Sequence, residues 1–177
     1  MTRPESSSQQ VRLRANFACE YCGVTETDTG GLLTVDHFQP RARGGSDELE
    51  NLVYCCHRCN LYKADYWPAD STAPPLWNPR REPMHAHLRL LADGCLSPLT
   101  AIGAVTVERL RLNRTALVAH RLRRRNQAAE IKSLAQYRKL LALLKDLKGE
   151  QSALVDEYSG LLADKRTLLR MLLQEDQ

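Results

Sequence analysis

Hydrophobic positions recur with two different spacings along this chain of 177 residues. In the first third, short apolar runs at residues 32–35 and 52–54 are flanked by turn-forming residues, a pattern typical of β-strands. Beyond Thr100 the apolar residues recur every three to four positions, which indicates helices. The pattern predicts an α+β fold, with a small mixed core at residues 11–67 and a mainly helical C-terminal half.

The helical half is expected to hold three helices. Residues 105–112 predict the first. Asn113 is a candidate N-cap for a second helix that starts at Arg114, because its side-chain oxygen can accept an unpaired backbone N–H. Gly149 is a typical C-terminal stop, after which Gln151 or Ser152 opens a third helix that reaches about Leu173.

Each of the last two helices carries one apolar face. In the second helix it comprises Ile131, Leu134, Tyr137, Leu141 and Leu144; in the third, Val155, Leu162 and Leu169 are seven apart, as are Tyr158, Lys165 and Leu172. Residues 126–177 are therefore predicted to form an antiparallel helical hairpin about 35 Å long. Two helices cannot fully bury such faces alone, so the hairpin is expected to form a homodimer or to dock on the core or a larger protein partner.

Proline and charge mark out the remaining segments. Residues 1–10 have the composition of a disordered lead-in, and the five prolines between Trp67 and Pro83 exclude regular structure there. Residues 68–125 are thus expected to be a Pro-rich strap and a basic helical extension, with Trp67 and Trp77 anchoring the strap on the core. Residues 71–125 contain 10 Lys and Arg against 3 Asp and Glu. A basic excess of this kind is typical of proteins that bind nucleic acid.

Composition also excludes some classes of protein. No apolar run approaches the roughly 18–20 residues that span a bilayer, and the N-terminus has no apolar signal-peptide region. A cytoplasmic location without a membrane partner is therefore expected. In that compartment the six cysteines should be reduced, which favours metal binding over a disulfide framework.

Two CxxC pairs predict a zinc site. Cys19 and Cys22 form the first pair, Cys56 and Cys59 the second, and 33 residues separate them. A CxxC turn holds two thiolates on one side, so two such turns can close a tetrahedral four-cysteine site. Cys55 competes with Cys56 as a ligand, but the spacing favours Cys56. A closed four-thiolate shell is structural: the zinc would staple a unit too small to fold on its hydrophobic core alone.

The same region resembles a known family. The motifs are CEYC, then VDHFQPRARGG, then Asn51-Leu52, then CHRCN and LYK. Together they are similar to the HNH endonucleases, specifically the four-cysteine members. Further on, WNPR, LSPLTAIGAVTVERLRLNR and ALVAHR look like an extension found in many HNH proteins, so the resemblance covers roughly residues 11–121.

The resemblance implies a ββα-metal core. Asp36 and His37 would lie on the first strand, Asn51 in the connecting loop, and residues 59–66 on the helix. His37 would be the general base that activates water. Asp36 and Asn60 would bind a catalytic divalent ion, Mg²⁺ or Mn²⁺, and Asn51 would bond the loop backbone and orient His37. Asn51 as a plain loop cap and Asn60 as a helix cap are alternatives that the sequence leaves open.

The basic residues near these motifs are candidate DNA contacts. Lys63, one turn beyond Asn60, would face the phosphate, although a helical lysine is often only solvated. The other candidates are Arg41, Arg43, Arg58, Arg121, Arg123, Arg124 and Arg125.

The function expected from these motifs is metal-dependent hydrolysis of DNA phosphodiester bonds. The main alternative is a catalytically silent, zinc-stapled DNA-binding or adaptor module. In a third possibility the nuclease is the effector of a larger machine that binds the C-terminal hairpin.

Overall fold

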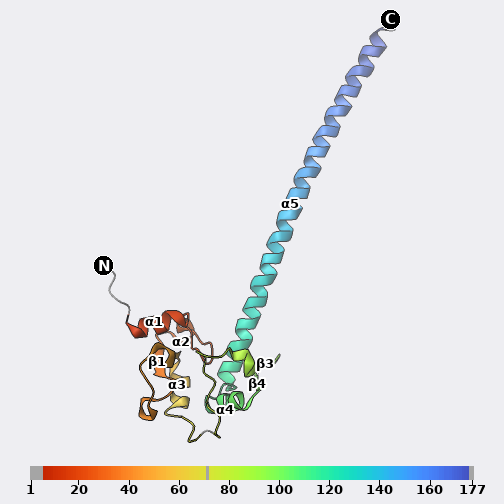
Figure 1. The fold of residues 1–177 in the computed structure, drawn as a ribbon. Helices are drawn as coiled ribbons and strands as arrows, with labels where there is room; N and C mark the ends of the chain where they lie inside the picture. Colours follow the sequence, from red (N-terminus) through yellow and green to blue (C-terminus); the bar gives the residue numbers. More distant parts are fainter. Residues whose placement is uncertain (1–5, 71, 176–177) are drawn as a thin grey trace, which may run out of the picture. The chain divides into compact units, whose positions relative to one another are not determined.

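The computed structural model describes residues 6–70 and 72–175. They belong to two compact units, Met1–Arg124 and Arg125–Gln177, which are described separately. The elements in chain order, most of which are labelled in Figure 1, are α1 (Ser7–Arg14), α2 (Glu26–Thr29), β1 (Thr34–His37), η1 (Arg41–Arg43), η2 (Leu49–Asn51), β2 (Leu52–Cys55), α3 (His57–Lys63), η3 (Met84–Ala86), β3 (Leu88–Leu90), β4 (Leu96–Pro98), α4 (Ala101–Arg109) and α5 (Thr115–Glu175). The mixture of short strands and helices confirms the α+β class.

Helix α1 lies in a segment for which the sequence predicts no helix. Residues 1–5 lie outside the described part of the chain, but α1 starts at Ser7, so the expectation of disorder is wrong for residues 7–10. Ser6 caps this helix by accepting a hydrogen bond from the Gln9 backbone N–H. Arg12 then joins α1 to α2 through two hydrogen bonds to Glu26, at 2.6 and 2.7 Å.

The core of the N-terminal unit is a two-stranded antiparallel sheet. Strands β1 and β2 pair so that Asp36 lies opposite Val53 and His37 opposite Leu52. All four residues of β2 are buried, whereas β1 is only partly covered. The partly covered strand therefore carries the polar candidates, and the buried strand supplies the packing.

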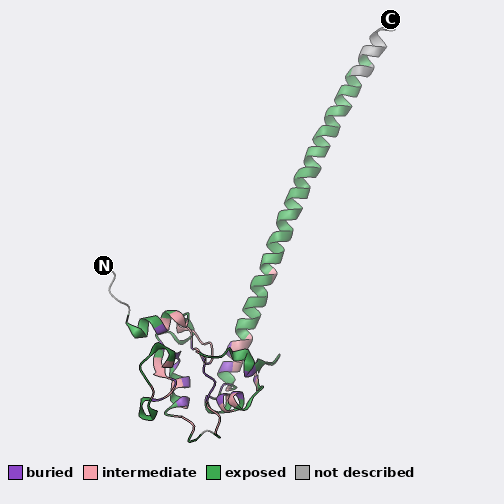
Figure 2. Ribbon diagram, viewed as in Figure 1, coloured by how far each residue is buried: buried purple, intermediate pink, exposed green. Residues whose placement is uncertain are grey.

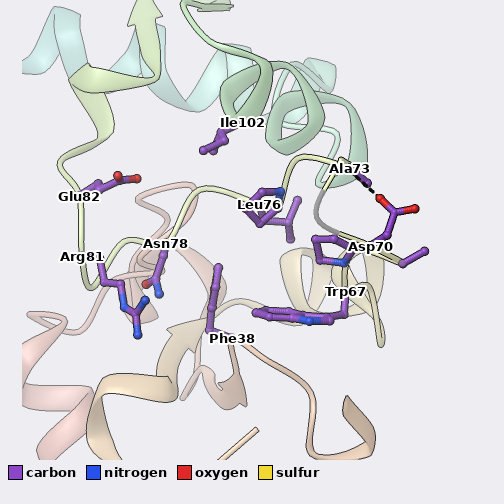
Figure 3. Close-up of a pocket in the computed structure, with 12 residues that line it drawn as sticks. Phe38, Trp67, Asp70, Ala73, Leu76, Asn78, Arg81, Glu82 and Ile102 are labelled. Atoms are coloured by element: carbon purple, nitrogen blue, oxygen red, sulfur yellow. Dashed lines mark hydrogen bonds between the residues drawn. The ribbon is translucent and has the colours of Figure 1, made fainter. Parts of the chain in front are cut away.

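The Pro-rich strap packs on this core through its two tryptophans. The Trp77 ring is buried and meets Tyr21 edge-on, with 6.4 Å between ring centroids. Trp67 meets Phe38 in the same way at 5.8 Å, and Figure 3 shows both rings at a pocket that Leu76 and Ile102 also line. The expected anchoring role of the tryptophans is confirmed.

The helical extension is more mixed than expected, and its first helix begins four residues earlier. A small hairpin, β3 and β4, precedes α4, which spans Ala101–Arg109 rather than residues 105–112. Thr100 caps α4 by accepting from the Gly103 backbone N–H. A Cβ on Gly103 would lie 2.2 Å from the His87 carbonyl oxygen, so only glycine permits this close approach.

The predicted C-terminal hairpin is wrong. Helix α5 runs without interruption from Thr115 to Glu175, and Gly149 lies within it. Asn113 is not a side-chain cap for this helix: its amide instead exchanges two hydrogen bonds with the Leu96 backbone, at 2.7 and 2.9 Å. Figure 2 shows the described part of α5 beyond Arg124 as almost entirely exposed. The side chains of Leu169 and Leu172 lie outside the described residues.

No helix in the described ranges is long and apolar enough to cross a membrane.

Candidate functional site

Four thiols converge at one end of the sheet. The sulfurs of Cys19, Cys22, Cys56 and Cys59 all lie within 4.8 Å of one another, and those of Cys22 and Cys56 are 3.8 Å apart. A tetrahedron with zinc–sulfur bonds of about 2.3 Å has edges of about 3.8 Å, so the cluster has the dimensions of a structural zinc site. The spacing argument for Cys56 over Cys55 is confirmed.

The thiols influence one another's ionisation. Hydrogen bonding from neighbouring thiols, Cys22 first, lowers the pKa of Cys19, and the same effect, with Cys19 first, lowers that of Cys56. The pKa values of Cys22 and Cys59 are raised, because each hydrogen-bonds to Cys19 and would have to ionise beside it. A bound cation offsets the repulsion between neighbouring thiolates, because it stabilises all four of them at once.

Cys55 is a core residue outside this cluster. It is fully buried at the end of β2, and burial raises the pKa of its thiol. The Thr34 hydroxyl donates to the Cys55 carbonyl oxygen at 3.0 Å. The residue therefore packs the strand pair and does not compete for the metal.

Lys63 joins the helix α3 to the candidate carboxylate on β1. Its ammonium lies 2.8 Å from Oδ2 of Asp36 and donates a 2.6 Å hydrogen bond to the carbonyl oxygen of His37. Only 1% of Lys63 is exposed. The charge of Lys63 therefore neutralises Asp36 inside the protein, and a DNA contact of this residue stays a prediction.

His37 lies at the end of β1 in a cluster of charged side chains. Its Nε2 is 2.6 Å from Oδ1 of Asp47, and Arg41 donates to the same carboxylate at 2.8 and 2.6 Å. Arg41 Nε also lies 3.2 Å from this Nε2, but the contact with the carboxylate is shorter. The carboxylate favours the tautomer that carries its proton on Nε2, which leaves Nδ1 as a proton acceptor. The hydrogen bonds to His37, first, and to Arg41 lower the pKa of Asp47, so the carboxylate is ionised at neutral pH.

Asn51 fixes the loop that follows His37. Its Oδ1 accepts from the Gln39 backbone N–H at 2.9 Å, and its Nδ2 donates to the carbonyls of Gln39 and Ser46 at 3.1 and 2.8 Å. Gly45 makes this loop compact, because a Cβ there would lie 1.8 Å from the Gln39 carbonyl oxygen. The side chain of Asn51 thus closes the loop that carries Arg41 and Asp47.

Replacing Asn51 with alanine should therefore loosen this loop. The variant loses three hydrogen bonds, two of them to carbonyls, at a cost of about 1–3 kcal/mol in the free energy of unfolding. Asn51→Asp is the matched variant: it keeps the acceptor but sets a carboxylate oxygen against the two carbonyl oxygens, so it should be no more stable than Asn51→Ala. Urea unfolding followed by tryptophan fluorescence measures both. Equal stability of all three proteins would contradict this account of the loop.

Asn60 lies on the side of α3 that faces the site. It precedes Lys63 by three residues, so the two side chains share a helix face. The helix N-cap is Cys56, whose sulfur accepts from the Cys59 backbone N–H, so capping is not the role of Asn60. Asn60 is half-buried, and none of the hydrogen bonds seen in the described residues engages its side-chain amide. That amide and the carboxylate of Asp36 are the oxygen donors that the family resemblance predicts as ligands of a hard cation.

The arginines predicted to contact DNA divide into two groups. Arg121 is committed to the fold: it donates to the carbonyls of Gly94 and Leu112 at 2.6 and 2.8 Å, and desolvation lowers its pKa. A DNA contact of Arg121 stays a prediction, beside this structural role. Arg124 is exposed and donates to the Gly23 carbonyl oxygen at 3.2 Å. Surface positions are also occupied by Arg41, Arg43, Arg58, Arg123 and Arg125.

Sequence reasoning missed Asp47. The residue follows the Gly44-Gly45-Ser46 turn, and in the sequence nothing distinguishes it from other loop aspartates. In the structure its side chain is 68% exposed. The only signal was its place in a loop closed by Gly45 and Asn51, ten residues after His37. Spacing alone cannot show that this loop turns back onto the histidine.

Comparisons with known proteins find matches for the segment that holds both clusters. Residues 19–65 match the family model described as HNH endonuclease. A segment of 53 residues, 29% of the chain, is 43% identical to the CRISPR-associated endonuclease Cas9 of Corynebacterium diphtheriae, and covers 5% of that protein. No solved structure matches the chain. The matched region contains both cysteine pairs and the segment from Asp36 to Lys63.

Proposed function

Because residues 19–65 match the family model of the HNH endonucleases, we propose that this protein hydrolyses DNA phosphodiester bonds with the help of a divalent ion. The observation that carries the proposal is His37 at the end of β1, with its Nε2 held 2.6 Å from the Asp47 carboxylate and with Asp36 preceding it on the strand. His37 and Asp36 are the two groups that such a reaction needs: a base for water and an oxygen ligand for a metal.

His37 is the proposed general base. Its Nε2 proton is directed to Asp47, so Nδ1 is the atom that takes a proton from water attacking phosphorus. Asn51 acts indirectly, because it holds the loop from which Asp47 reaches the ring. The histidine is thereby held in one tautomer and one orientation.

Asp36 and Asn60 are the proposed ligands of the catalytic ion. Carboxylate and amide oxygens suit hard ions such as Mg²⁺ or Mn²⁺ better than softer metals. When bound, such an ion supplies charge stabilisation for the transition state and the leaving oxygen. The four cysteines are proposed to hold a separate, structural zinc.

Cleavage of supercoiled plasmid tests this function. The full chain is incubated with plasmid in the presence of Mg²⁺, Mn²⁺ or a chelator, and the products are separated on agarose. Nicked or linear DNA with either ion, and none with the chelator, is the expected result. Intact plasmid under all conditions, together with retained DNA binding, would instead support the catalytically silent adaptor.

Asp47 provides a finer test of the base. Asp47→Ala removes the acceptor for Nε2 and should lower the cleavage rate about five- to tenfold, as expected for one lost hydrogen bond at an exposed site. Asp47→Asn retains an oxygen acceptor and should recover most of that loss. Rates are measured at saturating plasmid so that changes in DNA affinity do not contribute. If both variants cleave like wild type, Asp47 does not position His37.

The exposed apolar side chains of α5 beyond Arg124 support a proposed role in protein binding. A second copy of this chain and a larger protein partner are the two candidate occupants. The pattern of residues on the helix distinguishes between them, as argued next.

A further inference from the structure

The part of α5 beyond Arg124 carries an apolar stripe that nothing in the described structure covers. Leu134, Leu141, Val155 and Leu162 repeat at multiples of seven residues, and a second row, three residues on, holds Tyr137, Leu144 and Tyr158. These side chains are between 40% and 65% exposed. A repeat of seven with two apolar rows is the signature of a coiled coil, in which another helix buries both rows.

We propose that this stripe binds the same stripe of a second copy, in an antiparallel two-stranded coiled coil. In the proposed register Leu141 faces Tyr158 of the second copy, and Leu144 faces its Val155. The two-fold axis then passes between Gly149 and Glu150. Three independent features of the sequence favour this arrangement over a parallel pair or an unrelated partner. The inference does not depend on DNA cleavage.

A third row of leucines fits only the antiparallel pairing. Leu140, Leu147, Leu154 and Leu161 flank the stripe on one side and are 53–66% exposed. In an antiparallel pair this row meets itself, so Leu140 lies beside Leu161 of the second copy and Leu147 beside its Leu154. In a parallel pair the row would face the opposite flank, which carries polar residues: Arg138, Lys145, Ser152, Ser159 and Arg166.

The polar positions within the stripe lead to the same orientation. Lys148 and Lys165 interrupt the two apolar rows. In a parallel pair Lys148 would face Lys148 of the second copy, and Lys165 would face its Lys165, so that two layers of the interface would hold like charges. In the antiparallel register Lys148 faces Gln151 of the second copy, and Lys165 lies one helical turn from its Glu130. One central polar layer of this kind also fixes the register.

The charge of the helix is distributed in a complementary way. Residues 126–148 contain five Lys and Arg and two Asp and Glu, a net charge of +3, whereas residues 149–175 contain three and five, a net charge of −2. Antiparallel pairing places the basic half of each helix against the acidic half of the other. Parallel pairing would align like with like, so electrostatics favours a second copy in reverse orientation.

Disulfide trapping in the full-length, zinc-loaded protein tests the proposal. Two differently tagged chains, one carrying Leu141→Cys and the other Tyr158→Cys, are co-expressed and oxidised gently. Tryptic mass spectrometry then identifies the linked residues, so that links through native cysteines are not counted. Leu143→Cys replaces Leu141→Cys in the matched control, because Leu143 is 53% exposed but lies outside the stripe.

A link between residues 141 and 158 of different chains is expected, at least tenfold above the Leu143→Cys control. Light scattering of the wild type should give about twice the monomer mass of 20.0 kDa. Links of residue 141 to itself would show a parallel pair and overturn the proposal. A monomeric wild type without the interchain link would also overturn it, and would indicate a hairpin within one chain or a different partner.

Discussion

His37→Ala is expected to lower metal-dependent plasmid cleavage by a factor of about 10²–10⁴, the usual contribution of a general base. The ring is one-fifth exposed and lies at the end of a strand, so its removal should leave the core of the unit intact. The loss should appear in the rate at saturating plasmid, because the histidine activates water and is not proposed to bind DNA.

His85→Ala is the matched control for this variant. His85 is an exposed histidine on η3, remote in sequence from the motifs of the site. Its replacement should leave cleavage unchanged. Equal cleavage by His37→Ala and wild type would remove His37 from the mechanism, whereas a loss accompanied by altered tryptophan fluorescence would point to misfolding.

Loss of one zinc ligand should have the second large effect. Cys59→Ser removes a fully buried sulfur from a four-thiol cluster, and structural zinc supplies much of the folding free energy of small units. The N-terminal unit of this variant is expected to be unfolded at 25 °C and to contain no zinc, against one zinc per chain in the wild type.

Tryptophan fluorescence can report this unfolding separately from the long helix. Both tryptophans of the chain, Trp67 and Trp77, pack within the N-terminal unit, so their emission should shift to the red while the helical circular dichroism of α5 persists. Cys95→Ser, outside the cluster, is the control that should retain both zinc and the native emission. A folded, zinc-free Cys59→Ser protein would show that the thiols do not staple the unit.

The metal cluster could be predicted from spacing because a CxxC turn is a local structure. Two such turns determine the ligand set wherever the intervening chain goes, and the choice between Cys55 and Cys56 follows from the same geometry. The placement of Asp36 and His37 came from family resemblance. Periodicity alone gave only a short strand there.

The roles of long side chains could not be predicted in this way. In the sequence, Lys63 and Arg121 look like residues of a basic surface. In the structure each contacts an acceptor that is distant in sequence: Lys63 contacts Asp36, and Arg121 contacts the Gly94 carbonyl oxygen. Such partners are defined only by the tertiary fold. The contact of Asp47 with the His37 ring likewise depends on the tertiary fold, because the loop that carries Asp47 must turn back towards the ring.

The expectation of a hairpin depends on Gly149 as a helix stop, and a single glycine does not stop this helix. Glycine within a helix costs only about 1 kcal/mol relative to alanine, which a long helix tolerates. The informative signal was the phase of the repeat: Leu141 and Val155 are fourteen residues apart, so the apolar rows continue across Gly149 without a shift. In a continuous helix the seven-residue spacing must be kept across Gly149 if the apolar rows are to stay on one face. Two helices joined by a turn have no such requirement.

The ammonium of Lys63 next to Asp36 has a consequence for the order of binding. The carboxylate already has a monovalent counterion within 2.8 Å, and the proposed site offers a divalent ion only one carboxylate and one amide. Such a pair is too weak to strip much of the hydration shell from Mg²⁺, which usually binds to enzymes together with substrate phosphates. We therefore expect the free protein to hold Mg²⁺ loosely and the scissile phosphate to complete its coordination. The DNA would then be a co-ligand as well as a substrate.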